Sequence, residues 1–248
     1  MEKLKRIFAA VDMTEGRPWE KILIFTLPML LGNIAQQLYN TVDSVVVGKY
    51  VGDNALAAVG SAGPILNLLL VLFIGISVGA GIMVSQYLGA RRREELSVTI
   101  GNTIVLTFIS SVFIMVTATV AARPLLVLLN TPESILEWCT SYLRILFLGI
   151  AGMAYYNILC GILRGLGDSV SALIYLVVAS ILNIVLDLLF VAKFQMGVGG
   201  VALATAIAQA ISAVLCVRKL MSMTDFFDFK VKYFKLDKEI VAHVVRLG

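Results

Sequence analysis

Six long apolar runs are the feature that most constrains this sequence. A helix needs about 20 mostly apolar residues to cross the hydrocarbon core of a bilayer. A membrane β-barrel would instead need alternating strands of about ten residues, and these runs do not alternate. The sequence therefore predicts an all-α fold, a polytopic membrane bundle of six transmembrane helices. The runs cover residues 21–47, 56–84, 96–120, 138–160, 170–192 and 198–220.

The composition indicates the same environment. Hydrophobic residues make up 59% of the 248 positions and charged residues only 15%, whereas soluble domains carry about 25% charged residues. The lipid bilayer is therefore the expected surrounding. The net charge of +4 does not call for a nucleic-acid partner, because the positive residues lie in short loops, where membrane topology explains them.

Lysine and arginine are distributed unequally between the two sides of the predicted bundle. One side carries most of them, including residues 91–93, Arg164 and Arg218, whereas the other side has only Lys49, Arg123 and Lys193. Cytoplasmic loops are enriched in these residues. We therefore expect a multi-pass protein of the cell (inner) membrane with both termini in the cytoplasm.

Two carboxylates, Asp43 and Asp187, fall inside the apolar runs. A charged residue at membrane depth costs about 2.5–3.5 kcal/mol on insertion scales, so it needs a function or a partner. Both runs lead toward the outer side of the membrane. Asn183 lies one helical turn before Asp187, and Thr205, near the start of the sixth run, has a comparable depth. No obvious lysine or arginine partner shares that depth, so these four residues predict a cation site.

Two coupling ions, H⁺ and Na⁺, suit this site. Burial favours the neutral form of a carboxyl group, which can then bind and release a proton. The same oxygens, with Asn183 and Thr205, could hold a sodium ion, because hard cations take oxygen ligands. The alternative is that polar groups only join helices by hydrogen bonds, which we prefer for Gln37, Asn67 and Asn102. We expect no other cofactor.

Proline and glycine residues within the runs affect the course and packing of the predicted helices. Pro28 in the first run removes a backbone hydrogen bond, which makes it either a static kink or a hinge. Gly75, Gly79 and Gly81 in the second run allow close helix approach. The sequence has no Ser/His/Asp set, phosphate loop or metal-spaced cluster, so we do not expect an enzyme.

Several short motifs follow one another in a specific order and spacing. They are Asn40-Thr41-Val42-Asp43-Ser44, Ser85-Gln86-Tyr87-Leu88-Gly89-Ala90-Arg91-Arg92, Gly161-Ile162-Leu163-Arg164-Gly165-Leu166-Gly167-Asp168, Leu182-Asn183-Ile184-Val185-Leu186-Asp187 and Gly199-Gly200-Val201-Ala202-Leu203-Ala204-Thr205. Over nearly the whole chain this order resembles the amino-terminal half of the MATE (multidrug and toxic compound extrusion) transporters, bacterial DinF-like branch.

The resemblance implies one lobe of a twelve-helix, two-lobe fold and a cation-coupled antiporter, driven by protons or sodium. Such a protein exports organic, often cationic, drugs and toxins, so small organic cations are the implied substrates. The second six-helix lobe is an implied partner that this chain does not contain. The resemblance implies residue roles as well: a cation site at Asp43, Asn183, Asp187 and Thr205, a substrate cavity lined by Gln36 and Asn157, and a hinge at Pro28.

The predicted organisation has three parts. Residues 1–20 form a cytoplasmic N-terminal segment, residues 21–220 the six-helix transmembrane lobe, and residues 221–248 a cytoplasmic inter-lobe linker with the start of a seventh helix. One alternative is a lipid-linked oligosaccharide or polysaccharide flippase of the same superfamily. It ranks lower because Arg144 is the one intramembrane cation that the sequence predicts. The other alternative is a non-transporting membrane half-subunit.

Overall fold

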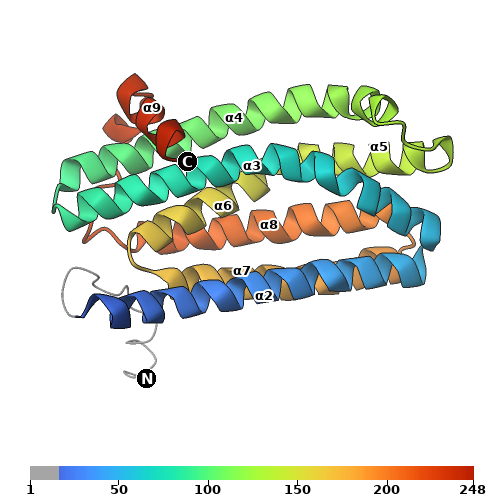
Figure 1. Ribbon diagram of the computed structural model, residues 1–248, viewed down its shortest axis with the longest axis horizontal. Coiled ribbons are helices and arrows are strands. Elements are labelled where there is room, and N and C mark those ends of the chain that lie inside the picture. The colour runs from blue at the N-terminus through green and yellow to red at the C-terminus, as the bar shows by residue number, and fades with distance from the viewer. Residues whose placement is uncertain (1–16) are drawn as a thin grey trace.

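The structure is a computed structural model, and it describes residues 17–248. Every regular element in that range is helical. The longer helices run along one common direction (Figure 1). In chain order the elements are α2 (Pro18–Tyr50), α3 (Asp53–Gly89), α4 (Arg93–Leu128), α5 (Glu133–Leu148), α6 (Ile150–Gly165), α7 (Ser169–Asp187), the π-helix η1 (Leu188–Lys193), α8 (Gly197–Met221), the 3₁₀-helix η2 (Val231–Tyr233) and α9 (Lys238–Leu247).

The predicted six-span bundle is confirmed, with one difference in its course. Five helices are long and apolar enough to cross a membrane, and α5 and α6 together make a sixth span that is bent by 54°. The run at 138–160 is therefore not one straight helix, because the chain breaks at Gly149. A Cβ atom added there would lie 2.5 Å from the Ala206 Cβ atom on α8. Glycine thus lets the break lie directly against α8.

The burial of the helices shows which of them form the centre of the bundle. Helix α8 lies in the middle of Figure 1, and 61% of its apolar segment is buried, against 11% for α2. Helix α2 packs mainly along α7 at one edge of the bundle. Among its exposed leucines, Leu23 and Leu38 are 60% and 62% accessible. Such an apolar outer surface suits lipid rather than water.

Small residues bring α3 and α6 into close contact. The Ser77 hydroxyl donates a 2.7 Å hydrogen bond to the Asn157 carbonyl oxygen. A Cβ atom added at Gly161 would lie 2.6 Å from the Ser77 carbonyl oxygen, and one added at Gly165 would lie 2.6 Å from the carbonyl oxygen of Gly81. The four-residue spacing on both helices is typical of close helix crossings in membranes. The predicted packing role of Gly81 is confirmed.

The segment after α8 folds back over the ends of α3 and α4. Arg93 donates to the carbonyl oxygens of Thr224 and Asp225, each at 2.7 Å, and to the Asp228 carboxylate at 2.8 Å. Hydrogen bonds from Arg93 and Lys230 hold the pKa of Asp228 below its usual value. These bonds fix the segment to the basic side of the bundle.

Helix α9 then lies on α3 where Gly75 and Gly79 leave room for it. The side chain of Asn102 accepts a hydrogen bond from the backbone N–H of Asp237, the residue before α9. Its predicted role in joining two helices stays a prediction. That α9 begins a seventh spanning helix stays a prediction. The predicted segment 1–20 lies mostly outside the described residues.

Candidate cation site

Four residues that the sequence predicts as a cation site meet in space. Helix α2 contributes Asp43, α7 contributes Asn183 and Asp187, and α8 contributes Thr205; α7 packs against both of the other helices. Asp187 is fully buried, Asn183 is 1% exposed and Thr205 is 5% exposed. Asp43 is partly exposed. We call these four residues the carboxylate site.

The side-chain amide of Asn183 joins the three helices. Its nitrogen lies 2.7 Å from Asp43 Oδ1 and 3.2 Å from Asp187 Oδ2, and its oxygen lies 3.2 Å from both the hydroxyl and the backbone nitrogen of Thr205. This orientation of the amide follows from its partners, because the opposite one would place its oxygen against two carboxylates. Asn183 therefore donates to both carboxyl groups and accepts from Thr205.

The second oxygen of Asp187 has no hydrogen-bond partner among the described residues. Asp187 Oδ1 is buried, and no hydrogen-bond donor among residues 17–248 reaches it. None of the ion pairs in that range involves Asp43 or Asp187. A buried acceptor without a donor costs about 1–3 kcal/mol. A proton on the carboxyl group, or a bound cation, would remove that cost.

The kinds of donor atom restrict which cation fits. The site offers two carboxylates, an amide and a hydroxyl. Within residues 17–248, no group of three or more His, Cys, Asp or Glu side chains is arranged to hold a metal ion. Oxygen ligands of this kind suit a proton or a hard ion such as sodium, whereas transition metals generally prefer histidine and cysteine.

The backbone becomes irregular immediately after the site. Asp187 is the last residue of α7, and the π-helix η1 follows it directly. Gly200 on α8 lies against this turn, because an added Cβ atom would be 3.2 Å from the Phe190 Cβ atom. Short π-helical turns occur frequently at functional sites. The apolar run at 170–192 predicts one regular helix and gives no sign of this turn.

The sequence did not predict three further buried polar side chains. Tyr39, Tyr142 and Gln209 are buried on α2, α5 and α8. Tyr39 and Gln209 line a small pocket together with Asn183. Gln209 Oε1 has no hydrogen-bond partner within the described range. Tyr39 lies one helical turn from Asp43, and Gln209 one turn from Thr205, a spacing that could have identified both. The sequence contains no comparable indication for Tyr142.

The other predicted residues lie apart from this network. Gln36 is exposed on α2, and the Asn157 amide donates to the Met153 carbonyl oxygen of its own helix at 2.8 Å. Hydrogen bonds among residues 17–248 do not link either residue to the carboxylate site. Pro28 lies inside α2, which continues to Tyr50. The cavity roles of Gln36 and Asn157 and the hinge role of Pro28 stay predictions.

A multi-pass helical bundle with a buried cluster of oxygen ligands inside its spans has the construction of a membrane transporter. Residues 28–189 match the MatE family. The chain belongs to this family.

Two curated relatives illustrate the match. The probable multidrug resistance protein YoeA of Bacillus subtilis (strain 168) is 33% identical over 247 residues, which cover 96% of this chain and 53% of YoeA. The multidrug export protein MepA of a Staphylococcus saprophyticus strain is 24% identical over 224 residues, which cover 90% of this chain and 50% of MepA. The chain thus spans about half the length of these relatives.

Solved structures of similar proteins agree with one lobe of this fold. The outward-facing conformation of a multidrug resistance MATE family transporter of the MOP superfamily matches with a TM-score of 0.88 and 30% identity, over 94% of this chain and 52% of that one. The inward-facing conformation of a multidrug resistance MATE family transporter of the MOP superfamily matches with a TM-score of 0.80 and 30% identity, over 86% of this chain and 48% of that one. The helices described here therefore correspond to one six-helix lobe, the amino-terminal one.

Proposed function

We propose that this chain is the amino-terminal lobe of a cation-coupled antiporter, which uses a proton or sodium gradient to export organic, often cationic, drugs and toxins. The names of the relatives support multidrug export. One observation supports cation coupling: the buried, unpartnered oxygen of Asp187, next to a second carboxylate that shares the same amide donor. The proposed setting is the cell membrane, with both termini in the cytoplasm and a second lobe as partner.

The mechanism follows from where α2 is held. Helix α2 is the least buried of the spanning helices, and Asp43 ties it to α7 through Asn183. A bound cation would neutralise the two carboxylates and favour one placement of α2. Pro28 would allow the change, and Gln36 and Asn157 would face the substrate. Coupling requires that the cation bind the two placements with different affinity, because tight binding alone shifts nothing.

Two variants test this proposal, Asp43→Asn and Asp187→Asn. Asparagine keeps the size of the side chain but removes the charge and the oxygen that takes up a proton. We expect both variants to insert into the membrane and to lose gradient-driven export. The measurement is efflux, under an imposed pH or sodium gradient, from proteoliposomes that contain this lobe together with its second lobe.

Asp53→Asn is the matched control. Asp53 is an exposed carboxylate in the first turn of α3, so its loss should leave export unchanged. Undiminished proton- and sodium-driven efflux by both site variants would contradict the proposal.

A further inference from the structure

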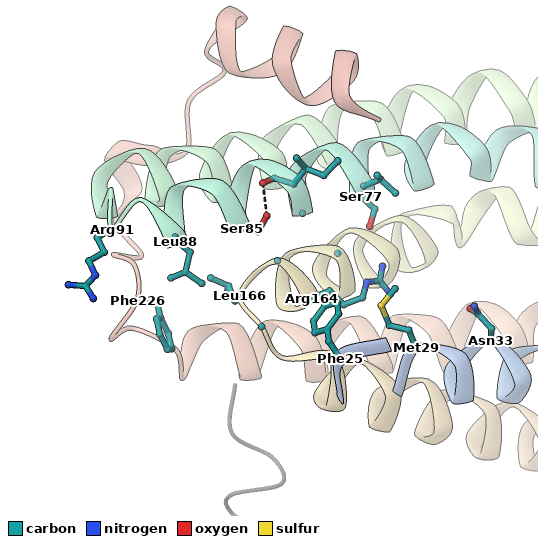
Figure 2. Close-up of a pocket in the computed structure, with 17 residues that line it drawn as sticks. Phe25, Met29, Asn33, Ser77, Ser85, Leu88, Arg91, Arg164, Leu166 and Phe226 are labelled. Atoms are coloured by element: carbon teal, nitrogen blue, oxygen red, sulfur yellow. Dashed lines mark hydrogen bonds between the residues drawn. The ribbon is translucent and has the colours of Figure 1, made fainter. Parts of the chain in front are cut away.

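A cavity of about 940 Å³ opens at the end of the bundle that carries the basic loops (Figure 2). Its walls come from α2, α3, the end of α6 and the turn that follows α6. None of the four carboxylate-site residues lines it. The volume lies near the upper end of the range for ligand sites. The cavity therefore has room for a ligand and is separate from the proposed cation site.

The charged side chains of the cavity wall are positive. Among the described residues, the charged ones that line it are Arg91 and Arg164, and none of the lining residues is acidic. In Figure 2 the Arg164 side chain lies within the cavity, in the same region as Phe25 and Met29 of α2, whereas Arg91 lies at the rim and points outward. Arg164 is therefore the cation that a ligand inside the cavity would meet.

The positive charge of Arg164 is not compensated within the described part of the chain. None of the ion pairs formed by residues 17–248 includes it. Asp168, four residues further along, has other partners: Lys219 lies 3.1 Å from its carboxylate, and Ser171 donates to it from backbone and side chain at 2.9 and 2.8 Å. An anion in the cavity would thus find a guanidinium whose donors are free to bind it.

The rest of the wall is mainly apolar and reaches the exposed surface of the described bundle. Met29 on α2 and Val78 on α3 line the cavity, and they are 39% and 46% exposed. A ligand could therefore enter sideways between these two helices. A cationic group at one end and apolar walls along the rest suit an amphiphilic anion, whereas an organic cation would be repelled by Arg164.

We propose that this cavity binds an anionic phospholipid, with the headgroup phosphate at Arg164 and an acyl chain along Met29 and Val78. Basic pockets between transmembrane helices on the cytoplasmic side bind anionic headgroups, and the planar guanidinium matches the geometry of a phosphate. The site goes beyond the proposed export function and does not depend on it.

The test is a comparison of lipid affinities by native mass spectrometry of the purified protein. Phosphatidylglycerol and phosphatidylcholine with identical acyl chains are titrated separately. We expect the wild type to prefer phosphatidylglycerol, and Arg164→Gln to reduce this preference about fivefold, the factor that corresponds to about 1 kcal/mol for one basic residue. Arg144→Gln is the control, because Arg144 is exposed on α5 and does not line the cavity. An unchanged preference in Arg164→Gln, or an equal loss in Arg144→Gln, overturns the proposal.

Two further measurements distinguish a lipid site from an unstable variant and from a site for a free anion. Ser85→Trp fills the cavity from an exposed position on α3 and keeps the arginine. It should also weaken phosphatidylglycerol binding, even if Arg164→Gln proves unstable, and unchanged binding overturns the proposal. Excess inorganic phosphate should leave the bound lipid in place, and complete displacement would overturn the proposal in favour of a free-anion site. None of these substitutions changes Asp43 or Asp187, so failure here is distinguishable from failure of cation-coupled export.

Discussion

Among single residues, Asn183 has the largest structural role in the carboxylate site. Its nitrogen serves carboxylates from two helices, and its oxygen accepts from Thr205 on a third. The Asn183 amide thus donates two hydrogen bonds and accepts from two groups of Thr205. This amide therefore links α2 to α7 near Asp43, and it lies where the proposed cation would bind.

Asn183→Leu should abolish the response of the protein to its coupling ion. Leucine has a similar size but provides no donor, so the two carboxyl groups lose their shared partner and stability falls by about 1–3 kcal/mol. A ligand that binds only the folded state raises its stability, so thermal unfolding in detergent should shift with sodium or with pH in the wild type and not in the variant. Thr205→Val, which removes one hydroxyl contact, should show a smaller loss of stability, about 1 kcal/mol. Equal ion-dependent shifts in wild type and Asn183→Leu would contradict this assignment.

The sequence predicted some residues and not others for a physical reason. Depth in the membrane can be counted along each run, so Asp43, Asn183, Asp187 and Thr205 could be grouped before their contacts were known. The rotation of a helix about its axis is set by packing between distant segments. Sequence reasoning therefore assigned Arg164 to a basic loop, whereas the structure places it in a cavity wall.

Among the elements, the spans were predictable and their irregularities were not. Hydropathy averages about 20 residues, so it finds a span but does not detect a break at one residue such as Gly149. The π-helical turn after Asp187 depends on how that turn packs against Gly200 on α8. Such local features arise from tertiary contacts, which a single sequence does not specify.

Gly161→Ala should separate α3 from α6. The added methyl group would lie 2.6 Å from the Ser77 carbonyl oxygen, so the two backbones must move apart, at a cost of about 1–3 kcal/mol. Thermal unfolding in detergent measures the loss. Gly60→Ala on α3 is the matched control, because no atom lies within 4 Å of its added Cβ and alanine favours the helix. If both variants had wild-type stability, the close contact would not contribute to the fold.

For the whole molecule, the buried share of each helix distinguishes a central part from a peripheral one. Helix α8 is mostly buried between its neighbours, whereas α2 lies at the edge and is largely exposed. The carboxylate site lies where α7 connects α2 to α8. The cavity at Arg164 lies beside the N-terminal half of α2. In the proposed mechanism, ion binding at the first location controls the placement of α2.

The most direct measurement of the central claim is ion release on substrate binding. An organic-cation substrate is added to the purified protein in weakly buffered solution, with proton release followed by a pH indicator and sodium release by a radioactive tracer. We predict that the wild type releases one of these ions when substrate binds, and that Asp187→Asn releases neither. Substrate binding without the release of either ion from the wild type, or the same release from Asp187→Asn, would contradict the claim that Asp43 and Asp187 hold the coupling ion.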